Sequence, residues 1–180
     1  MLNQDEYYPA SSETCFRRLR DDVLPAVSVP ARNVFHGLTV ARWTVGVQIV
    51  EEDFDARLLR CRLHRAAGAP VLVRSPEFRV HAKPIVEDEN ACHVLVRPTS
   101  LEQLGGRTGA GLGRAAEALG AALVGSGLGW TISTIHVDGA PTITPSDWVE
   151  REYATRKLGQ ALLTAMARQV HVHLKRLIAA

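Results

Sequence analysis

The sequence predicts an α+β domain, in which a single antiparallel β-sheet carries its helices on one side. Two observations lead to this prediction. Segments rich in β-branched and aromatic residues follow one another between residues 38 and 98 with no helical pattern between them, as in a meander. The full order is then helix, meander, helix, hairpin and helix, which is typical of an antiparallel sheet rather than of alternating βαβ units.

The first half of the chain begins with residues 1–11, for which we expect a flexible N-terminus. Ser12-Glu13-Thr14 is typical of a helix cap, so a short helix is expected through about residue 24, where Pro25 ends it. Strands are expected over residues 38–50, 56–63, 71–82 and 91–98. Gly68-Ala69-Pro70 predicts a turn between the second and third of these strands, and Pro76 indicates that the third is an edge strand or contains a bulge.

The second half starts with an Ala- and Leu-rich segment over residues 108–127, which predicts a helix after a glycine-rich entry. A strand is expected over residues 130–137, and Asp138-Gly139 is a strong hairpin signal. Residues 140–148 are then the return strand. From about residue 147 to residue 178 the pattern predicts one long helix, and its apolar stripe comprises Leu158, Leu162, Met166, Val170, Leu174 and Leu177. No linker interrupts the chain, so residues 1–180 are expected to form a single domain.

Length and composition narrow the possible functions. The chain has 180 residues, of which 46% are hydrophobic, and this suits one globular domain with a substantial core. A net charge of +2 gives no support for nucleic-acid binding. There is neither an apolar run long enough to span a bilayer nor a basic and apolar leader, so no membrane partner and a cytoplasmic location are expected. A monomer or a homodimer is compatible with these features.

The cysteines argue against a disulfide framework and against a metal site. They are Cys15, Cys61 and Cys92, an odd number without C-x-x-C spacing. His171 and His173 are two residues apart on a predicted helix and point in different directions, so they make a poor pair of metal ligands. We therefore expect three buried thiols and no bound metal.

Four segments, taken in chain order, resemble the chorismate lyase family, also called chorismate–pyruvate lyase or 4-hydroxybenzoate synthase. Leu59-Arg60 is followed at the family's spacing by the turn Gly68-Ala69-Pro70 and an apolar strand. "LEQLGGRTGAGLGRAAEAL" is similar to the segment that leads into a family helix, and "GLGWTISTIHVDGAPTIT" is similar to the last hairpin. "SETCFRRL" resembles the family's first helix. Together these segments span about residues 12–146.

The resemblance implies an antiparallel sheet that holds its ligand in a pocket, and an enzyme that cleaves chorismate to 4-hydroxybenzoate and pyruvate without a cofactor. Chorismate is a small anion with two carboxylates, for which a planar arginine fork is a suitable partner. The family's carboxylate-binding arginine corresponds to Arg60. Its backbone amide donors to the ligand correspond to Leu112 and Cys15. The family's active-site glutamate has no counterpart here, and Asp147 is the nearest acid, at a position where a helix N-cap is also expected.

Two other functions remain open at this point. The first is a non-catalytic domain of the same fold that binds a carboxylate. The second is an acyl-CoA-dependent transferase, because "RKLGQALL" (156–163) fits the R-x-x-G-x-A signature of that class. The role of Arg60 is also open, since strand alternation places Arg60, Arg62 and His64 on one face. Either the curvature of the sheet buries only Arg60, or all three side chains belong to a solvated face.

Overall fold

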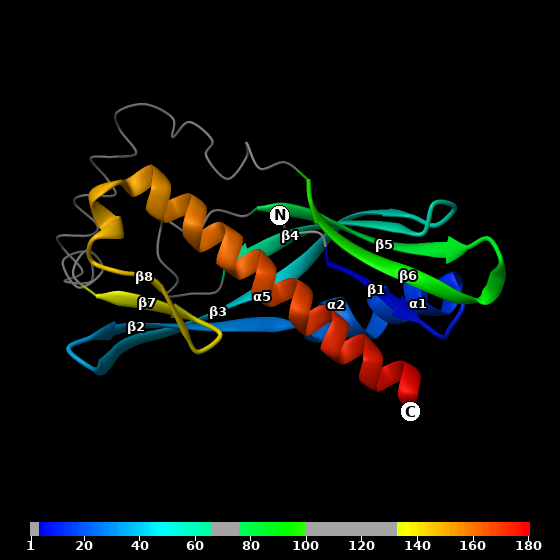
Figure 1. Ribbon diagram of the computed structural model, residues 1–180, viewed down its shortest axis with the longest axis horizontal. Helices are drawn as coiled ribbons and strands as arrows, with labels where there is room; N and C mark the ends of the chain where they lie inside the picture. Colours follow the sequence, from blue (N-terminus) through cyan, green and yellow to red (C-terminus); the bar gives the residue numbers. More distant parts are fainter. Residues whose placement is uncertain (1–3, 66–75, 100–132) are drawn as a thin grey trace.

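The computed structural model describes residues 4–65, 76–99 and 133–180 (Figure 1). Eight strands in these ranges form one antiparallel sheet in the order β1-β6-β5-β4-β3-β2-β7-β8. The strands are β1 (Gln4–Tyr8), β2 (Ser28–Phe35), β3 (Leu38–Asp53), β4 (Leu58–Arg65), β5 (Glu77–Ile85), β6 (Asp88–Pro98), β7 (Thr134–Val137) and β8 (Ala140–Ile143). The meander from β3 to β6 is therefore the centre of the sheet.

The helices of the described residues lie on one side of this sheet. They are α1 (Ser12–Arg18), a π-helical turn η1 (Leu19–Val23), α2 (Leu24–Ala26), a 3₁₀ turn η3 (Asp147–Val149) and the long α5 (Arg151–Ala179). The Ser11 hydroxyl accepts a hydrogen bond from the Thr14 amide at 3.2 Å and caps α1. Helix α5 crosses the sheet diagonally and contacts both edge strands, β1 and β8 (Figure 1). The sheet thus curls around α5.

Strand alternation divides the sheet into two faces. On β4, Leu59, Cys61 and Leu63 are at most 1% exposed and face the helices; we call this the inner face. The opposite, outer face carries the residues between them. The inner face and the helices enclose one hydrophobic core, to which α5 contributes Leu158, Leu162, Met166, Val170 and Leu174. Burial of each such side chain stabilises the fold by about 2 kcal/mol relative to exposure, so the predicted apolar stripe anchors α5.

The structure confirms the predicted fold class, a single antiparallel sheet with helices on one side and a long C-terminal helix. It corrects the prediction of a flexible N-terminus, because residues 4–8 form β1, which pairs with β6 so that Tyr8 lies opposite Cys92. It also adds β2, which was not predicted. The β2 segment contains Pro30, which stands on the outer face. Proline has no N–H to donate, but the Pro30 carbonyl accepts a hydrogen bond from the Asp138 amide at 2.8 Å.

The end of the chain follows the predicted order with shifted boundaries. Asp138 and Gly139 form the β7–β8 turn with φ angles of 50° and 83°, which is the left-handed conformation that this dipeptide favours. The return strand ends at Ile143, because a turn and η3 come next, and α5 begins at residue 151 rather than 147. The helix expected over residues 108–127 and the turn at Gly68-Ala69-Pro70 lie outside the described residues.

A β-bulge shapes the pairing between β3 and β4. Ile49 pairs with Cys61, but Arg60 pairs with Glu51, so Val50 is an extra residue in β3. The bulge places Glu51 on the outer face, opposite Arg60. Without it, the regular alternation would direct Glu51 towards the core.

Within the ranges that the structure describes, none of the helices combines the length and the apolar character that a membrane span requires.

Candidate functional site

Arg60, the predicted carboxylate ligand, lies on the outer face of β4 and points away from the helices. Its strand neighbours Leu59 and Cys61 are fully buried on the inner face. The Arg60 Nη1 atom forms an ion pair with Glu51 Oε2 at 3.0 Å, and its side chain is 41% exposed. Curvature therefore does not separate Arg60 from Arg62 and His64, and all three share the outer face.

The two predicted amide donors give different outcomes. Leu112 lies outside the described residues. Cys15 is fully buried in α1, and its backbone N–H already donates to the Ser11 carbonyl at 3.0 Å. Because a backbone N–H can make only one strong bond, the Cys15 amide is occupied by the helix and is not offered to a ligand. Cys15 faces the core whereas Arg60 faces outwards, so the sheet separates these two predicted ligand contacts.

Asp147 holds the turn between β8 and α5. Its Oδ2 atom accepts hydrogen bonds from the Thr144 amide at 2.7 Å and the Thr144 hydroxyl at 2.9 Å, and Lys157 Nζ lies 3.1 Å away. The bonds from Thr144, with a further contribution from Lys157, hold the pKa of Asp147 below its usual value. A proton donor needs a raised pKa, so the geometry gives Asp147 a structural role. It starts η3 rather than capping α5, which begins at Arg151.

Three arginines follow one another across neighbouring strands of the outer face. Arg60 on β4 lies directly opposite Arg79 on β5, and Arg79 lies directly opposite Arg97 on β6. The Cβ atoms of such pairs are about 5 Å apart, and like charges at this distance are destabilising. Among the described residues, Glu51 pairs with Arg60 but no carboxylate forms an ion pair with Arg79 or Arg97. Within the described part of the chain, their positive charge is therefore not compensated by an ion pair.

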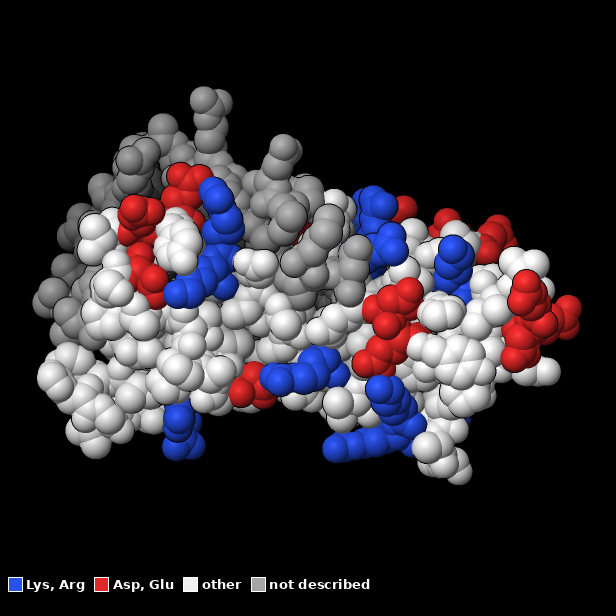
Figure 2. Space-filling view, in the orientation of Figure 1, with Lys and Arg blue, Asp and Glu red and all other residues white. Residues whose placement is uncertain are grey.

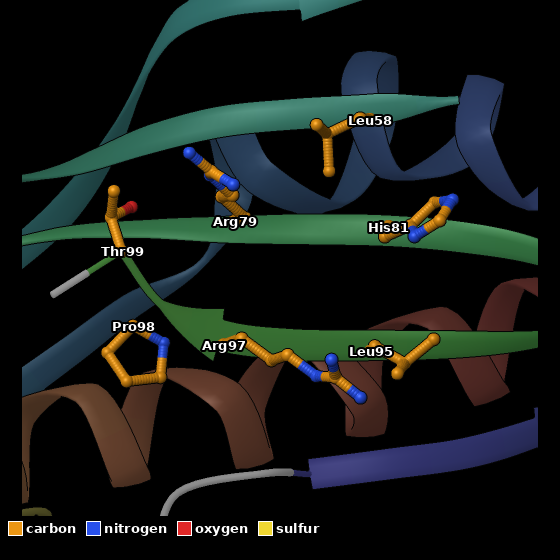
Figure 3. Close-up of a pocket in the computed structure, with 7 residues that line it drawn as sticks. All are labelled: Leu58, Arg79, His81, Leu95, Arg97, Pro98 and Thr99. Carbon is orange, nitrogen blue, oxygen red and sulfur yellow. The ribbon is translucent and has the colours of Figure 1, made fainter. Parts of the chain in front are cut away.

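A hollow of about 270 Å³ lies beside Arg79 and Arg97. Figure 3 shows its lining, in which β5 contributes Arg79 and His81, the neighbouring β4 contributes Leu58, and β6 contributes Leu95 and Arg97. Pro98 and Thr99 complete it. We call this hollow the arginine pocket. It combines two guanidinium groups, which have no acidic partner among the described residues, with the apolar side chains of Leu58 and Leu95.

Two polar groups of the arginine pocket are suited to hydrogen bonding. Partial burial, followed by the charges of Lys83 and Arg97, lowers the pKa of His81 despite a backbone bond that acts in the opposite direction. His81 is therefore neutral near pH 7, with one ring nitrogen hydrogen-bonded to the backbone of Ala56 and the other able to accept a hydrogen bond. The Thr99 hydroxyl is buried and has no partner within the described part of the chain.

Sequence reasoning identified the row of charges on β4 but missed the arginines on the two neighbouring strands, β5 and β6. Arg79 and Arg97 stand in "EFRVHA" and "VLVRP" at positions that alternate with apolar residues, and this alternation was the available signal. What the sequence does not contain is the register that puts Arg60, Arg79 and Arg97 in one row. A shift of one residue in either pairing would separate them.

The face that carries α5 has a different distribution of charge. In Figure 2, acidic and basic groups lie beside one another along the helix, with uncharged surface between them. The ion pair between Lys175 and Glu6, at 2.6 Å, is one example, and Arg156 with Glu152 is another. In each of these pairs the two charges compensate one another, in contrast to Arg79 and Arg97, which form no ion pair with a carboxylate of the described residues.

Comparison with known proteins gives distant structural likenesses only. No protein-family model and no curated protein matches the chain. The Zhui aromatase/cyclase from Streptomyces sp. R1128 is similar over 94% of both chains, with 15% identity and a TM-score of 0.36. A truncated norcoclaurine synthase from Thalictrum flavum is similar over 54% of this chain and 71% of its own, with 12% identity and a TM-score of 0.33. These likenesses assign no activity to the chain.

Proposed function

We propose that this protein binds a small organic carboxylate with a cyclic or aromatic body in the arginine pocket. The observation that carries the proposal is the in-register pair Arg79 and Arg97, which has no acidic partner among the described residues. A carboxylate can accept two parallel hydrogen bonds from an arginine fork. Leu58 and Leu95 offer an apolar surface for the ring of the same ligand.

Elimination of pyruvate from chorismate is the enzymatic form of this proposal. Chorismate has two carboxylates, and Arg79 and Arg97 offer two cations. The reaction also needs a group that moves a proton. Among the described residues, Glu51 is paired with Arg60, Glu77 with Arg62, and Asp147 with Lys157. The pairing of these three acids favours binding of a carboxylate over its conversion, and the lyase activity stays a prediction.

The acyl-CoA-dependent transferase receives no support from the position of its signature. Residues 156–163 lie inside α5, where Leu158 and Leu162 are buried in the core. Beyond the first turn of a helix, the backbone N–H groups are used by the helix itself. The stretch therefore offers no turn of free amides that could hold a pyrophosphate.

Calorimetric titration with 4-hydroxybenzoate tests the proposed function. The double variant Arg79→Gln/Arg97→Gln is expected to bind at least about tenfold more weakly than the unmodified protein, because hydrogen bonds to charged groups contribute about 1.5–3 kcal/mol each. Arg17→Gln is the matched control, since Arg17 is an exposed arginine on α1 that pairs with Glu13. An equal Kd for the double variant and the unmodified protein would contradict the proposal.

Two further measurements separate binding from catalysis and charge from shape. Release of pyruvate from chorismate by the purified protein, abolished in Arg79→Gln/Arg97→Gln, would support the lyase form. Binding of chorismate without release of pyruvate would support the binding proposal and contradict the lyase activity. The uncharged amide 4-hydroxybenzamide has nearly the same shape as 4-hydroxybenzoate, so it is expected to bind more weakly, and equal binding would contradict a role for the arginines.

A further inference from the structure

We propose that a second hollow of the outer face binds the phosphoryl group of a phosphate monoester. This hollow has a volume of about 690 Å³ and lies over strands β3, β2 and β7. Arg32, Arg42 and His136 are its charged and titratable side chains. It shares no residue with the arginine pocket, so this inference stands independently of the proposed function.

The register of three strands brings these side chains into one row. Arg42 on β3 lies directly opposite Arg32 on β2, and Arg32 lies directly opposite His136 on β7. Both arginines are exposed, and neither forms an ion pair with a carboxylate of the described chain. Like charges directly opposite one another are destabilising in a sheet unless an anion lies between them. The repulsion between Arg32 and Arg42 therefore favours binding of a ligand with more than one negative charge.

Further polar groups surround this row. The His136 Nδ1 atom is buried and has no partner in the part of the chain that the structure describes. Thr44 borders the hollow in the next row, where it lies opposite Pro30. An imidazole and a hydroxyl can both donate hydrogen bonds to phosphoryl oxygens. The donors of four side chains thus line one hollow.

The acid closest in sequence does not neutralise the row. Asp138 stands in the turn after His136, but its carboxylate forms an ion pair with Arg168 of α5. The adjacent Gly139 also lines the hollow, and a Cβ atom built on it would meet nothing within 4 Å. The turn therefore leaves the hollow open, and the charge of Asp138 is compensated from the helix side.

The chemistry of the lining favours a phosphoryl group over a carboxylate. A phosphate monoester carries a charge of about −1.5 to −2 near pH 7 and three acceptor oxygens, which two guanidinium forks and an imidazole can share. Pro30 supplies an apolar side chain, whereas Ala31 and Trp43 are buried on the inner face and border the hollow through their backbone. Space remains beside the phosphoryl group for the organic part of a monoester.

Calorimetric titration with phenyl phosphate tests this inference. Arg32→Gln/Arg42→Gln is expected to weaken binding at least about tenfold, because each arginine contributes charge-assisted hydrogen bonds. The matched control is Arg17→Gln/Arg18→Gln, which removes two exposed arginines of α1 that lie in neither hollow, and it is expected to leave the Kd for phenyl phosphate unchanged. An unchanged Kd in Arg32→Gln/Arg42→Gln, or an equal loss in the control variant, would overturn the inference.

A measurement on the unmodified protein avoids any dependence on the folding of variants. In a ¹H–¹⁵N spectrum, the Gly139 amide resonance is expected to shift and saturate as phenyl phosphate is added. Benzoate, which has a similar ring and only one negative charge, is expected to shift it much less at the same concentration. No shift with phenyl phosphate, or equal shifts with both ligands, would overturn the assignment of this hollow to a phosphoryl group.

Discussion

Strand β5 contrasts the two faces of the sheet within five consecutive residues. Phe78, Val80 and Ala82 are at most 1% exposed on the inner face. Arg79 and His81, which alternate with them, line the arginine pocket on the outer face. The inner face is filled by the helices and by apolar side chains, with few polar groups. The outer face carries several cationic side chains, and two of them, Arg79 and Arg97, form no ion pair with an acid of the described residues.

This contrast separates the residues that hold the fold from those that are available to a ligand. A helix-covered face must be apolar to be stable, because burial there supplies the main free energy of folding. The outer face has no such requirement, so its charged rows reflect a different constraint. Substitutions on the two faces should therefore differ in kind: those of the inner face change stability, and those of the outer face change binding.

The largest expected effect is on the inner face. Phe78→Ala removes a side chain that is 1% exposed and should lower the free energy of unfolding by about 3–5 kcal/mol, because a cavity remains. Arg79→Ala, one residue further along the same strand, is expected to change it by less than about 0.5 kcal/mol. Urea denaturation of both variants measures the difference. Similar losses would show that the two faces do not differ as described.

The next effect concerns a polar pair on the inner face. Trp43 Nε1 donates to Asn33 Oδ1 at 3.1 Å, and Asn33 is fully buried. Trp43→Phe leaves the Asn33 oxygen without a donor, so the free energy of unfolding should fall by about 1–3 kcal/mol. In Trp43→Phe/Asn33→Val both partners are apolar, and part of the loss should be recovered. A double variant less stable than the single one would contradict this explanation.

A smaller effect is expected from pH. Burial lowers the pKa of His171, with Lys175 acting in the same direction and Glu6 in the opposite one. Because the folded pKa lies below the unfolded value of 6.5, the folded protein disfavours the charged imidazole. The contribution of neutral His171 to the free energy of unfolding is therefore complete above about pH 6.5. It is lost as the pH falls towards the folded pKa, because the unfolded state then binds more protons than the folded state.

Chemical denaturation between pH 7.5 and pH 5 measures this dependence, in the range set by the ordinary histidine pKa of about 6.5. His171→Leu is expected to flatten the decline of stability towards acid pH. His81 also has a lowered pKa, on the outer face, so His81→Gln is the matched control and should flatten it less, because His81 is only partly buried. An unchanged slope in His171→Leu would exclude His171 as the source.

The smallest effect is expected for an ion pair of the outer face. Arg62 Nη2 and Glu77 Oε1 are 2.6 Å apart, with side chains 44% and 19% exposed. Such partly solvated pairs contribute about 0.2–1 kcal/mol. A double-mutant cycle of Arg62→Ala and Glu77→Ala should give a coupling in this range. A coupling as large as the loss in Phe78→Ala would mean that the outer face also holds the fold.

The sequence predicted the sheet of the meander, the β7–β8 turn and α5, because these elements are specified locally by alternation, turn residues and an apolar stripe. It missed β1, whose residues "QDEYY" lack the β-branched side chains typical of strands. The partner of β1 is β6, far along the chain, so no local signal marks it. It also missed β2, in which Pro30 and polar residues obscure the alternation.

The candidate site was predicted less well than the fold. Arg60 was predicted as the carboxylate ligand, but it forms an ion pair with Glu51 and does not line the arginine pocket. The prediction that Arg60, Arg62 and His64 share a face is confirmed by their common position on the outer face. The grouping of Arg60 with Arg79 and Arg97 depends on two strand registers. Register follows from side-chain packing and turn geometry across the whole sheet, and a single segment does not reveal it.

The bulge in β3 has a consequence for changes in chain length. Val50 is the extra residue, so deleting its codon would join Ile49 to Glu51 and make the ladder regular, with Cys61 and Arg60 still opposite their present partners. Deletion of a residue from the regular part of β3 would instead reverse the alternation on one side of the deletion. The side chains there would change face, and charged groups would point into the core. Position 50 is therefore a place where an evolving gene could shorten this strand by one amino acid at little cost to its pairing with β4.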